Sequence, residues 1–167
     1  MLKTIVLIGM MGSGKTSVGK ELAKKLNLSF IDIDHEIERK YDKTVFEIFK
    51  KKGEPFFRKI EENISCKLID GKPGVIALGG GAYLNKKIRN RIKLHGISIW
   101  VNTSLENIYL RINNSKNKRP LLDYKNLKKT IKKIYDERKP IYKMADYIIK
   151  SNSNSKKETV NKIIKIL

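Results

Sequence analysis

A glycine-rich segment near the amino terminus carries the clearest chemical signal in the sequence. Residues 9–16 read Gly-Met-Met-Gly-Ser-Gly-Lys-Thr, which matches G-x-x-x-x-G-K-[ST] between an apolar run and an amphipathic stretch. In such a loop, backbone N–H groups and the dipole of the following helix surround phosphates. We expect Lys15 to reach the β- and γ-phosphates of ATP and the Thr16 hydroxyl to ligate Mg²⁺. The rest of the predicted ATP site comprises Gly12, Ser13, Gly14 and Ser17.

Two acidic residues, Asp32 and Asp34, close the next apolar run. In an extended chain, residues two apart face the same way, so we expect both carboxylates to point together at the end of a strand. One can hold the metal through water, and the other can orient or deprotonate an attacking hydroxyl. The alternative is a pair of solvated acids that begin a helix carrying Glu36 and Glu38, where negative charge is favourable.

Arginine is scarce, with seven of the 37 basic residues, so its positions are informative. A guanidinium can bind a carboxylate through two parallel hydrogen bonds, which a lysine ammonium cannot do. Arg58 and Arg138 are therefore candidates for binding a substrate carboxylate. The alternative for each is an ion pair on a helix surface, with Glu61 available to Arg58 three residues away.

The motifs that contain these residues resemble, in order, those of the shikimate kinase family. The Asp-x-Asp of residues 32–34 is followed by Phe-Arg-x-x-Glu at 57–61, Gly-Gly-Gly at 79–81, Arg-Pro-Leu-Leu at 119–122 and Arg-x-Pro-x-Tyr at 138–142. The resemblance covers nearly the whole chain. It implies a kinase that transfers the γ-phosphate of ATP to the 3-hydroxyl of shikimate, in the pathway to chorismate and the aromatic amino acids.

The resemblance also implies how the acceptor is bound. Asp34 would orient or deprotonate the attacking hydroxyl. Arg58 and Arg138 would hold the carboxylate of shikimate, and the backbone N–H of Gly80 would contact the same substrate. From its position at a strand end, the alternative for the triple glycine is a flexible turn.

On the nucleotide side, the resemblance implies that Asp32 positions the metal together with Thr16. Arg119 matches the arginine of the family's lid, which would move over the phosphates, so the implied catalytic residues are Lys15, Asp34 and Arg119. A solvated basic loop is the alternative for Arg119. Arg111 precedes Arg119 by eight residues where the family pattern has seven, and its contact with adenine stays open.

The elements that must position these residues are short apolar runs alternating with amphipathic stretches. Strands are predicted at 4–8, 29–32, 75–78, 98–101 and 147–150, and helices at 15–26, 45–51, 56–69, 85–94, 105–112, 124–138 and 156–166. This alternation predicts an α/β fold of three layers, with a five-stranded parallel sheet and helices on both faces. The resemblance implies that this is the P-loop kinase fold. Ligands should collect at the carboxyl ends of the strands. The polar residues 112–124 are predicted to form a lid.

Length and composition predict a single domain over residues 1–167. Cys66 is the only cysteine, so no intramolecular disulfide can form, and no run is long enough to span a bilayer. The first apolar run ends in glycines and is interpreted as a strand rather than a signal peptide. We expect a cytoplasmic monomer that binds ATP and shikimate, with Mg²⁺ as cofactor, and that binds neither membrane nor nucleic acid.

The formal net charge of +20 leaves alternatives open. It can attract nucleic acid through counterion release, accelerate encounter with anionic substrates, or reflect a lysine bias spread along the chain. The alternative functions are a small kinase acting on gluconate or a nucleoside monophosphate, and a basic ATPase that depends on nucleic acid. The sequence has no Asn-Lys-x-Asp run typical of GTPases and no recognisable base-stacking module.

Overall fold

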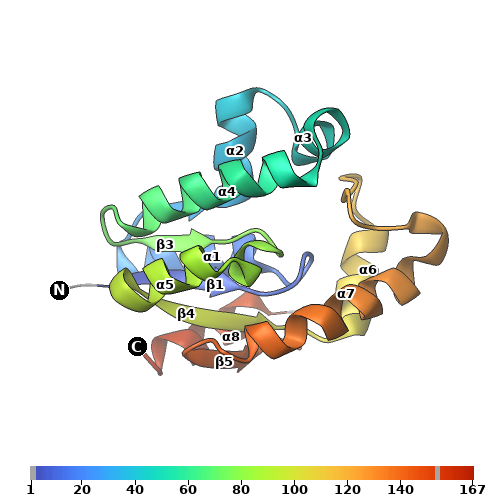
Figure 1. Ribbon diagram of the computed structural model, residues 1–167. Helices are drawn as coiled ribbons and strands as arrows, with labels where there is room; N and C mark the ends of the chain where they lie inside the picture. Colours follow the sequence, from blue (N-terminus) through green and yellow to red (C-terminus); the bar gives the residue numbers. More distant parts are fainter. Residues whose placement is uncertain (1–2, 153–154) are drawn as a thin grey trace.

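The computed structural model describes residues 3–152 and 155–167, which form a sheet of five parallel strands (Figure 1). The strand order is β2-β3-β1-β4-β5. Each neighbouring pair is parallel, so all carboxyl ends lie at one edge of the sheet. The strands are β1 (Thr4–Ile8), β2 (Phe30–Asp32), β3 (Val75–Ala77), β4 (Gly96–Asn102) and β5 (Tyr147–Lys150).

The central strand β1 is buried on both faces, which explains its continuous apolar sequence. Val6 and Ile8 belong to one hydrophobic cluster, whereas Ile5 and Leu7 belong to another. Because side chains alternate along a strand, these two clusters lie on opposite faces of the sheet. The sheet is therefore the middle of three layers, as predicted.

Helices of both layers bury apolar side chains against the sheet. On the Leu7 side these are α1 (Lys15–Leu26) and α8 (Lys156–Ile164), which pack against each other. On the Val6 side they include α4 (Glu54–Ile69), α5 (Lys86–His95) and α7 (Leu127–Tyr142). None of the helices in the described ranges is long and apolar enough to cross a membrane.

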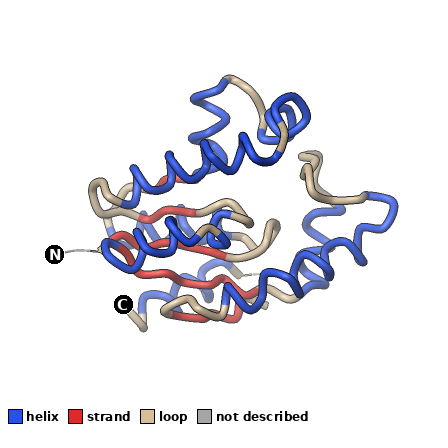
Figure 2. The backbone as a smooth tube through the Cα atoms, in the orientation of Figure 1, coloured by secondary structure: helices blue, strands red, loops and turns tan. Residues whose placement is uncertain are grey.

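The remaining helices lie at the edge of the sheet where the strands end. They are α2 (Ile33–Tyr41), α3 (Val45–Lys52), α6 (Leu105–Asn113) and the short 3₁₀ helices η1 (Ala82–Leu84) and η2 (Tyr124–Asn126). Figure 2 shows the tan loop of residues 114–123 between α6 and η2, directed towards the region of α3 and α4. This irregular stretch is slightly shorter than the predicted lid, because Ile112 and Tyr124 belong to the flanking helices.

The structure differs from the expected elements most clearly at α2 and at the end of α7. Residues 33–41 form helix α2, so Asp34 is not on an extended strand. Asp32 begins this helix, because its Oδ1 accepts hydrogen bonds from the N–H groups of Asp34 and His35. Helix α7 continues beyond Arg138 and through Pro140 to Tyr142, although proline removes one backbone donor.

Candidate active site

The glycine-rich loop joins β1 to α1 and encloses the ammonium group of Lys15. Lys15 Nζ donates hydrogen bonds of 2.8 Å to both Gly9 O and Met10 O. Gly14, with φ +94°, precedes the first residue of α1 in a conformation that favours glycine. Burial lowers the pKa of Lys15 to about 8, although the charges of Asp34 and Asp32 oppose the shift. The side chain is therefore mostly cationic near neutral pH.

A contact from the end of β4 anchors this loop. Thr103 is buried, and its hydroxyl donates a hydrogen bond of 2.9 Å to Ser13 O. A Cβ on Gly9, whose φ is +139°, would lie only 2.8 Å from Val101 O. No sequence pattern connects Thr103 with Ser13, because ninety positions separate the two residues.

Oxygen atoms suited to a metal meet where α1 faces β2. Thr16 Oγ1 donates a hydrogen bond of 2.6 Å to Asp32 Oδ2. Within the described ranges, no group of three or more histidine, cysteine, aspartate or glutamate residues has the geometry to hold a metal ion. Mg²⁺ needs no such group, since it is commonly bound through one or two carboxylates, water and substrate phosphates. Thr16 and Asp32 together fit that requirement.

Asp34 lies in the first turn of α2, and its backbone N–H donates to Asp32 Oδ1 at 3.1 Å. Both aspartates line the same cavity at the end of β2. Burial raises the pKa of Asp34, and the charge of Asp32 adds to the effect, whereas Arg119 and Lys15 oppose it. A carboxylate with a raised pKa is a better proton acceptor than a solvated one.

Two connected hollows open at this edge of the sheet. The larger has a volume of about 670 Å³ and is lined by the phosphate loop, Asp32 and residues of the 114–123 loop. The smaller has a volume of about 60 Å³ and contains both arginines proposed for the carboxylate, Arg58 and Arg138. Residues that line both hollows are Met11, Asp34, Val45, Gly80, Arg119 and Pro120. Asp34 and Arg119 therefore lie at the junction between a nucleotide-sized space and the small pocket that contains the two arginines.

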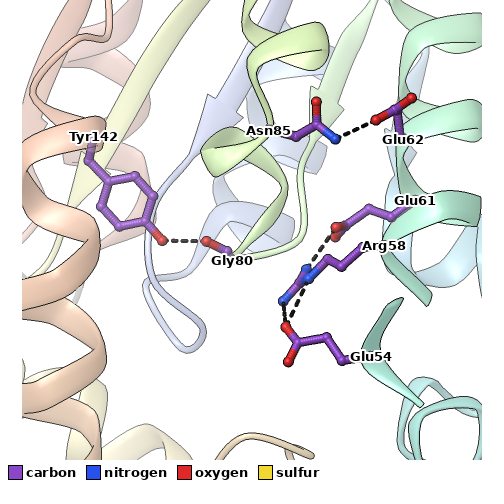
Figure 3. A network of polar contacts seen from close by, with 7 residues as sticks. All are labelled: Glu54, Arg58, Glu61, Glu62, Gly80, Asn85 and Tyr142. Carbon is purple, nitrogen blue, oxygen red and sulfur yellow. Dashed lines mark hydrogen bonds and ion pairs between the residues drawn. The ribbon is translucent and has the colours of Figure 1, made fainter. Parts of the chain in front are cut away.

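Arg58 makes the ion pair considered as its alternative role, yet it also lines the small pocket. Its guanidinium lies 2.7 Å from Glu61 Oε2 and 3.1 Å from Glu54 Oε1, as Figure 3 shows. The same group lies over the rings of Phe57 and Phe49, which pack with centroids 4.6 Å apart. These contacts hold a planar cation against an apolar wall, and they leave it accessible to a ligand.

Arg138 is 5% exposed, and its Nη1 atom is buried without a hydrogen-bond partner in the described part of the chain. A buried, unpaired donor is costly, so such an atom marks a place where a ligand oxygen is favourable. The side chain lines the small pocket across from Arg58. The two arginines come from α7 and α4, which are far apart in sequence.

The triple glycine allows three pocket side chains to lie directly against the backbone. A Cβ on Gly79 would lie 2.5 Å from Glu61 Oε1, and one on Gly80 would lie 3.0 Å from Arg138 Nη1. A Cβ on Gly81 would lie 2.5 Å from Arg58 Nη2. The segment is therefore a close-packed floor of the pocket, not a free turn.

Glu61 is the buried acid of the pocket. It is 2% exposed, and burial raises its pKa to about 7 despite the opposing charge of Arg58. Its Oε1 atom has no hydrogen-bond partner within the described residues. The sequence marks Glu61 only as a possible ion-pair partner of Arg58 three residues away, because spacing along a helix does not show burial in a pocket.

Arg119 and Arg111 approach the nucleotide side from α6 and the loop that follows it. The Arg119 side chain lines both hollows, and its backbone N–H donates to the Tyr124 hydroxyl at 2.8 Å. Arg111 donates from Nη1 to Gly12 O at 3.1 Å. Arg111 therefore contacts the phosphate loop itself.

Comparison with known proteins agrees with this arrangement. The chain matches the family model for shikimate kinase over residues 11–167. It is 40% identical to a shikimate kinase of Cereibacter sphaeroides over 92% of this chain and 76% of that protein. The structure of shikimate kinase from Acinetobacter baumannii in complex with shikimate superimposes with a TM-score of 0.94 at 38% identity, covering 99% and 93% of the two chains.

A more distant likeness concerns the fold alone. A deoxyadenosine kinase from M. mycoides with bound dCTP aligns with a TM-score of 0.61 at 17% identity, over 98% of this chain and 97% of that one. The family match extends over both hollows and over each motif from Asp32 to Tyr142. The chain belongs to the shikimate kinase family.

Proposed function

We propose that this chain transfers the γ-phosphate of ATP to the 3-hydroxyl of shikimate, giving ADP and shikimate 3-phosphate. The observation that carries the proposal is the junction of the two hollows at Asp34, Gly80 and Arg119. A nucleotide held by the phosphate loop would direct its terminal phosphate towards a small acid held between Arg58 and Arg138. Family membership supports the same acceptor.

The nucleotide site is proposed to comprise Gly12, Ser13, Gly14, Lys15, Thr16, Ser17 and Arg119. Thr16 and Asp32 are the residues that would hold Mg²⁺, which when bound neutralises charge on the β- and γ-phosphates. Lys15 is buried beside them and supplies a cation that water does not screen. Arg119 reaches the hollow from the 114–123 loop and would add positive charge as the phosphoryl group is transferred.

On the acceptor side, Arg58 and Arg138 would each bind the carboxylate of shikimate. Binding there gives Arg138 Nη1 the partner that it lacks within the described residues. Asp34 would accept a hydrogen bond from the attacking hydroxyl, orient it and take its proton, because its carboxylate is the acid at the junction. The backbone of Gly80 forms the floor on which the acceptor lies.

We expect the enzyme to act as a cytoplasmic monomer, without nucleic acid or membrane as a partner. The acceptor can be tested by measuring ADP release from Mg-ATP with shikimate, gluconate, nucleoside monophosphates or RNA. Turnover that requires shikimate supports the proposal. Turnover that requires another compound and ignores shikimate overturns the acceptor and retains the nucleotide site.

A matched pair of variants tests the pocket in the same assay. Arg58→Ala should lose most shikimate-dependent turnover. Arg39→Ala should not, because Arg39 pairs only with Glu36 on the exposed surface of α2. Equal losses in both variants would contradict the assignment of Arg58.

A further inference from the structure

Tyr142 connects helix α7 to the glycine segment 79–81. It follows Arg138 by four residues, so the two side chains lie on the same face of the helix. Tyr142 is fully buried, and its hydroxyl donates a hydrogen bond to Gly80 O (Figure 3). Its ring packs against Trp100 with centroids 5.5 Å apart. Because Arg138 Nη1 also lies against Gly80, one helix contacts this glycine twice.

The hydrogen bond from Tyr142 orients a peptide that glycine would otherwise leave free. The described residues contain no cis peptide bond, so the Gly81 N–H points opposite to the Gly80 carbonyl across the planar peptide. With that carbonyl directed at Tyr142, the Gly81 N–H points away from α7. Gly81 itself packs against Arg58. Tyr142 thereby sets the orientation of the backbone that separates the two arginines.

Glu62 makes a matching connection from α4. It follows Arg58 by four residues, and its Oε2 accepts a hydrogen bond of 2.6 Å from Asn85 Nδ2. Asn85 directly follows η1, the short helix that begins after Gly81, and its side chain caps α5. Lys87 also donates to Glu62, at 2.9 Å. Helix α4 is thus attached at Asn85, just beyond the glycine segment, whereas α7 is attached within this segment at Gly80.

We infer that Tyr142 and Glu62 are positioning residues. They fix the positions of Arg138 and Arg58 relative to the glycine segment 79–81. Neither residue is part of the lining of the small pocket, so each acts through the helix that it attaches. The inference rests on the proposed function, since it concerns the same carboxylate site. It adds two residues that bind no substrate atom and yet determine how well the acceptor is held.

The positions of the two arginines matter because both are proposed to bind the same carboxylate. A bidentate contact between guanidinium and carboxylate needs both partners in one plane at hydrogen-bond distance. An error of about 1 Å in the placement of a substrate can cost about 100-fold in rate. Because α4 and α7 are distant in sequence, only tertiary contacts such as these two can fix the separation of their arginines.

The first test compares Tyr142→Phe with Tyr135→Phe. Tyr135 is on the same helix, but its hydroxyl makes only a long contact of 3.5 Å with Asn102. We expect Tyr142→Phe to raise the KM for shikimate about 3- to 10-fold, the loss of one hydrogen bond, while the KM for ATP stays within about twofold. Tyr135→Phe should change neither constant. A merely structural role would lower the thermal unfolding midpoint of Tyr142→Phe and leave the KM for shikimate unchanged, which would overturn the inference.

Glu62 provides a rescue experiment. Glu62→Ala removes the acceptor for Asn85 and should raise the KM for shikimate. Glu62→Gln keeps an oxygen that can accept the same hydrogen bond and should restore the wild-type value. If Gln fails to restore it, charge rather than attachment is the property that matters, and the inference is wrong for Glu62.

A double-mutant cycle shows whether Tyr142 acts through Arg138. In an Arg138→Ala background, Tyr142→Phe should produce little further change in the KM for shikimate, because the side chain that it positions is gone. Full additivity would overturn this part of the inference.

A readout without substrate separates this inference from the proposed function. In ¹H–¹⁵N NMR spectra, Tyr142→Phe should shift or broaden the Gly81 amide, whose peptide carries the carbonyl of Gly80, and the Arg138 Nε–H signal, and Tyr135→Phe should not. If the wild type does not phosphorylate shikimate, the proposed acceptor is overturned, and this comparison still decides the positioning role. Unchanged Gly81 and Arg138 signals in Tyr142→Phe would overturn it.

Discussion

At the scale of single residues, the site combines groups whose ionisation is shifted by burial. Burial lowers the pKa of Lys15 and raises the pKa of Asp34. The two arginines differ from each other, because Arg58 is held by two acids and Arg138 Nη1 has no partner in the described chain. A bound carboxylate would therefore give the buried Arg138 Nη1 a hydrogen-bond partner, which removes the cost of leaving it unpaired. At Arg58 it would be a third acidic group beside Glu54 and Glu61.

The role of Asp34 can be tested by Asp34→Asn, which keeps the size of the side chain and removes its capacity to accept a proton. We expect kcat to fall about 10²- to 10⁴-fold, the range for loss of a general base, with a smaller change in the KM for ATP. Steady-state kinetics with ATP and shikimate provide the measurement. A kcat within a few-fold of the wild type would show that orientation alone suffices.

Lys15 makes ATP binding depend on pH. Its pKa is lowered to about 8, so the ammonium proposed to contact the phosphates is present below that pH and is lost as the pH rises through it. We expect the KM for ATP to rise between about pH 7.5 and 9.5 in proportion to the neutral fraction. Lys15→Arg is the control, because arginine stays protonated in this range and should remove the dependence on pH. The same rise in Lys15→Arg would assign the titration to another group.

At the scale of elements, the capping box of α3 presents part of the pocket wall. Thr44 Oγ1 accepts from the Glu47 N–H at 3.2 Å, and Glu47 Oε2 accepts from the Thr44 N–H at 2.8 Å. The next residue, Val45, lines both hollows, and its N–H donates to Glu38 at 2.9 Å. The start of α3 is thus fixed from two sides.

Removal of this cap should cost stability. Thr44→Ala should lower the free energy of unfolding by about 1 kcal/mol, the usual effect of losing an N-cap side chain. Urea denaturation gives the measurement, and Thr130→Ala in α7 is the control, because the Thr130 hydroxyl donates to the carbonyl of Asn126 and caps no helix. A loss in Thr44→Ala no larger than in the control would show that Glu38 alone holds the helix start.

The elements that could be predicted from the sequence were those with clear hydrophobic periodicity or with clear turn and capping residues at their ends. All five strands and seven of the helices were expected near their observed positions, because apolar runs and amphipathic spacing mark them. Helix α2 was considered only as the alternative for Asp32 and Asp34, since its apolar residues, Ile33, Ile37 and Tyr41, are sparse among six polar ones and follow a strand directly. The continuation of α7 through Pro140 was not expected, because proline commonly ends a helix and the burial of Tyr142 beyond it is a tertiary property.

The tertiary contacts that complete the site were beyond sequence patterns. Tyr142 to Gly80 and Thr103 to Ser13 join residues that are 62 and 90 positions apart. Spacing arguments address neighbours on one helix or strand, and they contain no information on which elements meet. The residue types in the motifs predicted a phosphate loop and a pair of arginines. The structure was needed to show which other residues line the pocket that contains both arginines.

At the scale of the whole molecule, the chain carries a formal charge of +20, and the substrates proposed for it are both anions. We expect this charge to accelerate encounter, so increasing ionic strength should lower kcat/KM for shikimate several-fold while kcat changes by less than about twofold. Added RNA should compete with the substrates or have no effect. Stimulation of turnover by RNA would favour the nucleic-acid-dependent ATPase that the composition also permits.

The most direct test of the account compares shikimate with its methyl ester, in which the carboxylate is masked and the ring hydroxyls are unchanged. In the wild type we expect kcat/KM to be about 10- to 100-fold higher for shikimate, since a hydrogen bond to a charged group contributes about 1.5–3 kcal/mol. In Arg138→Ala this preference should largely disappear. Equal turnover of acid and ester by the wild type, or no phosphorylation of either compound, would contradict the account.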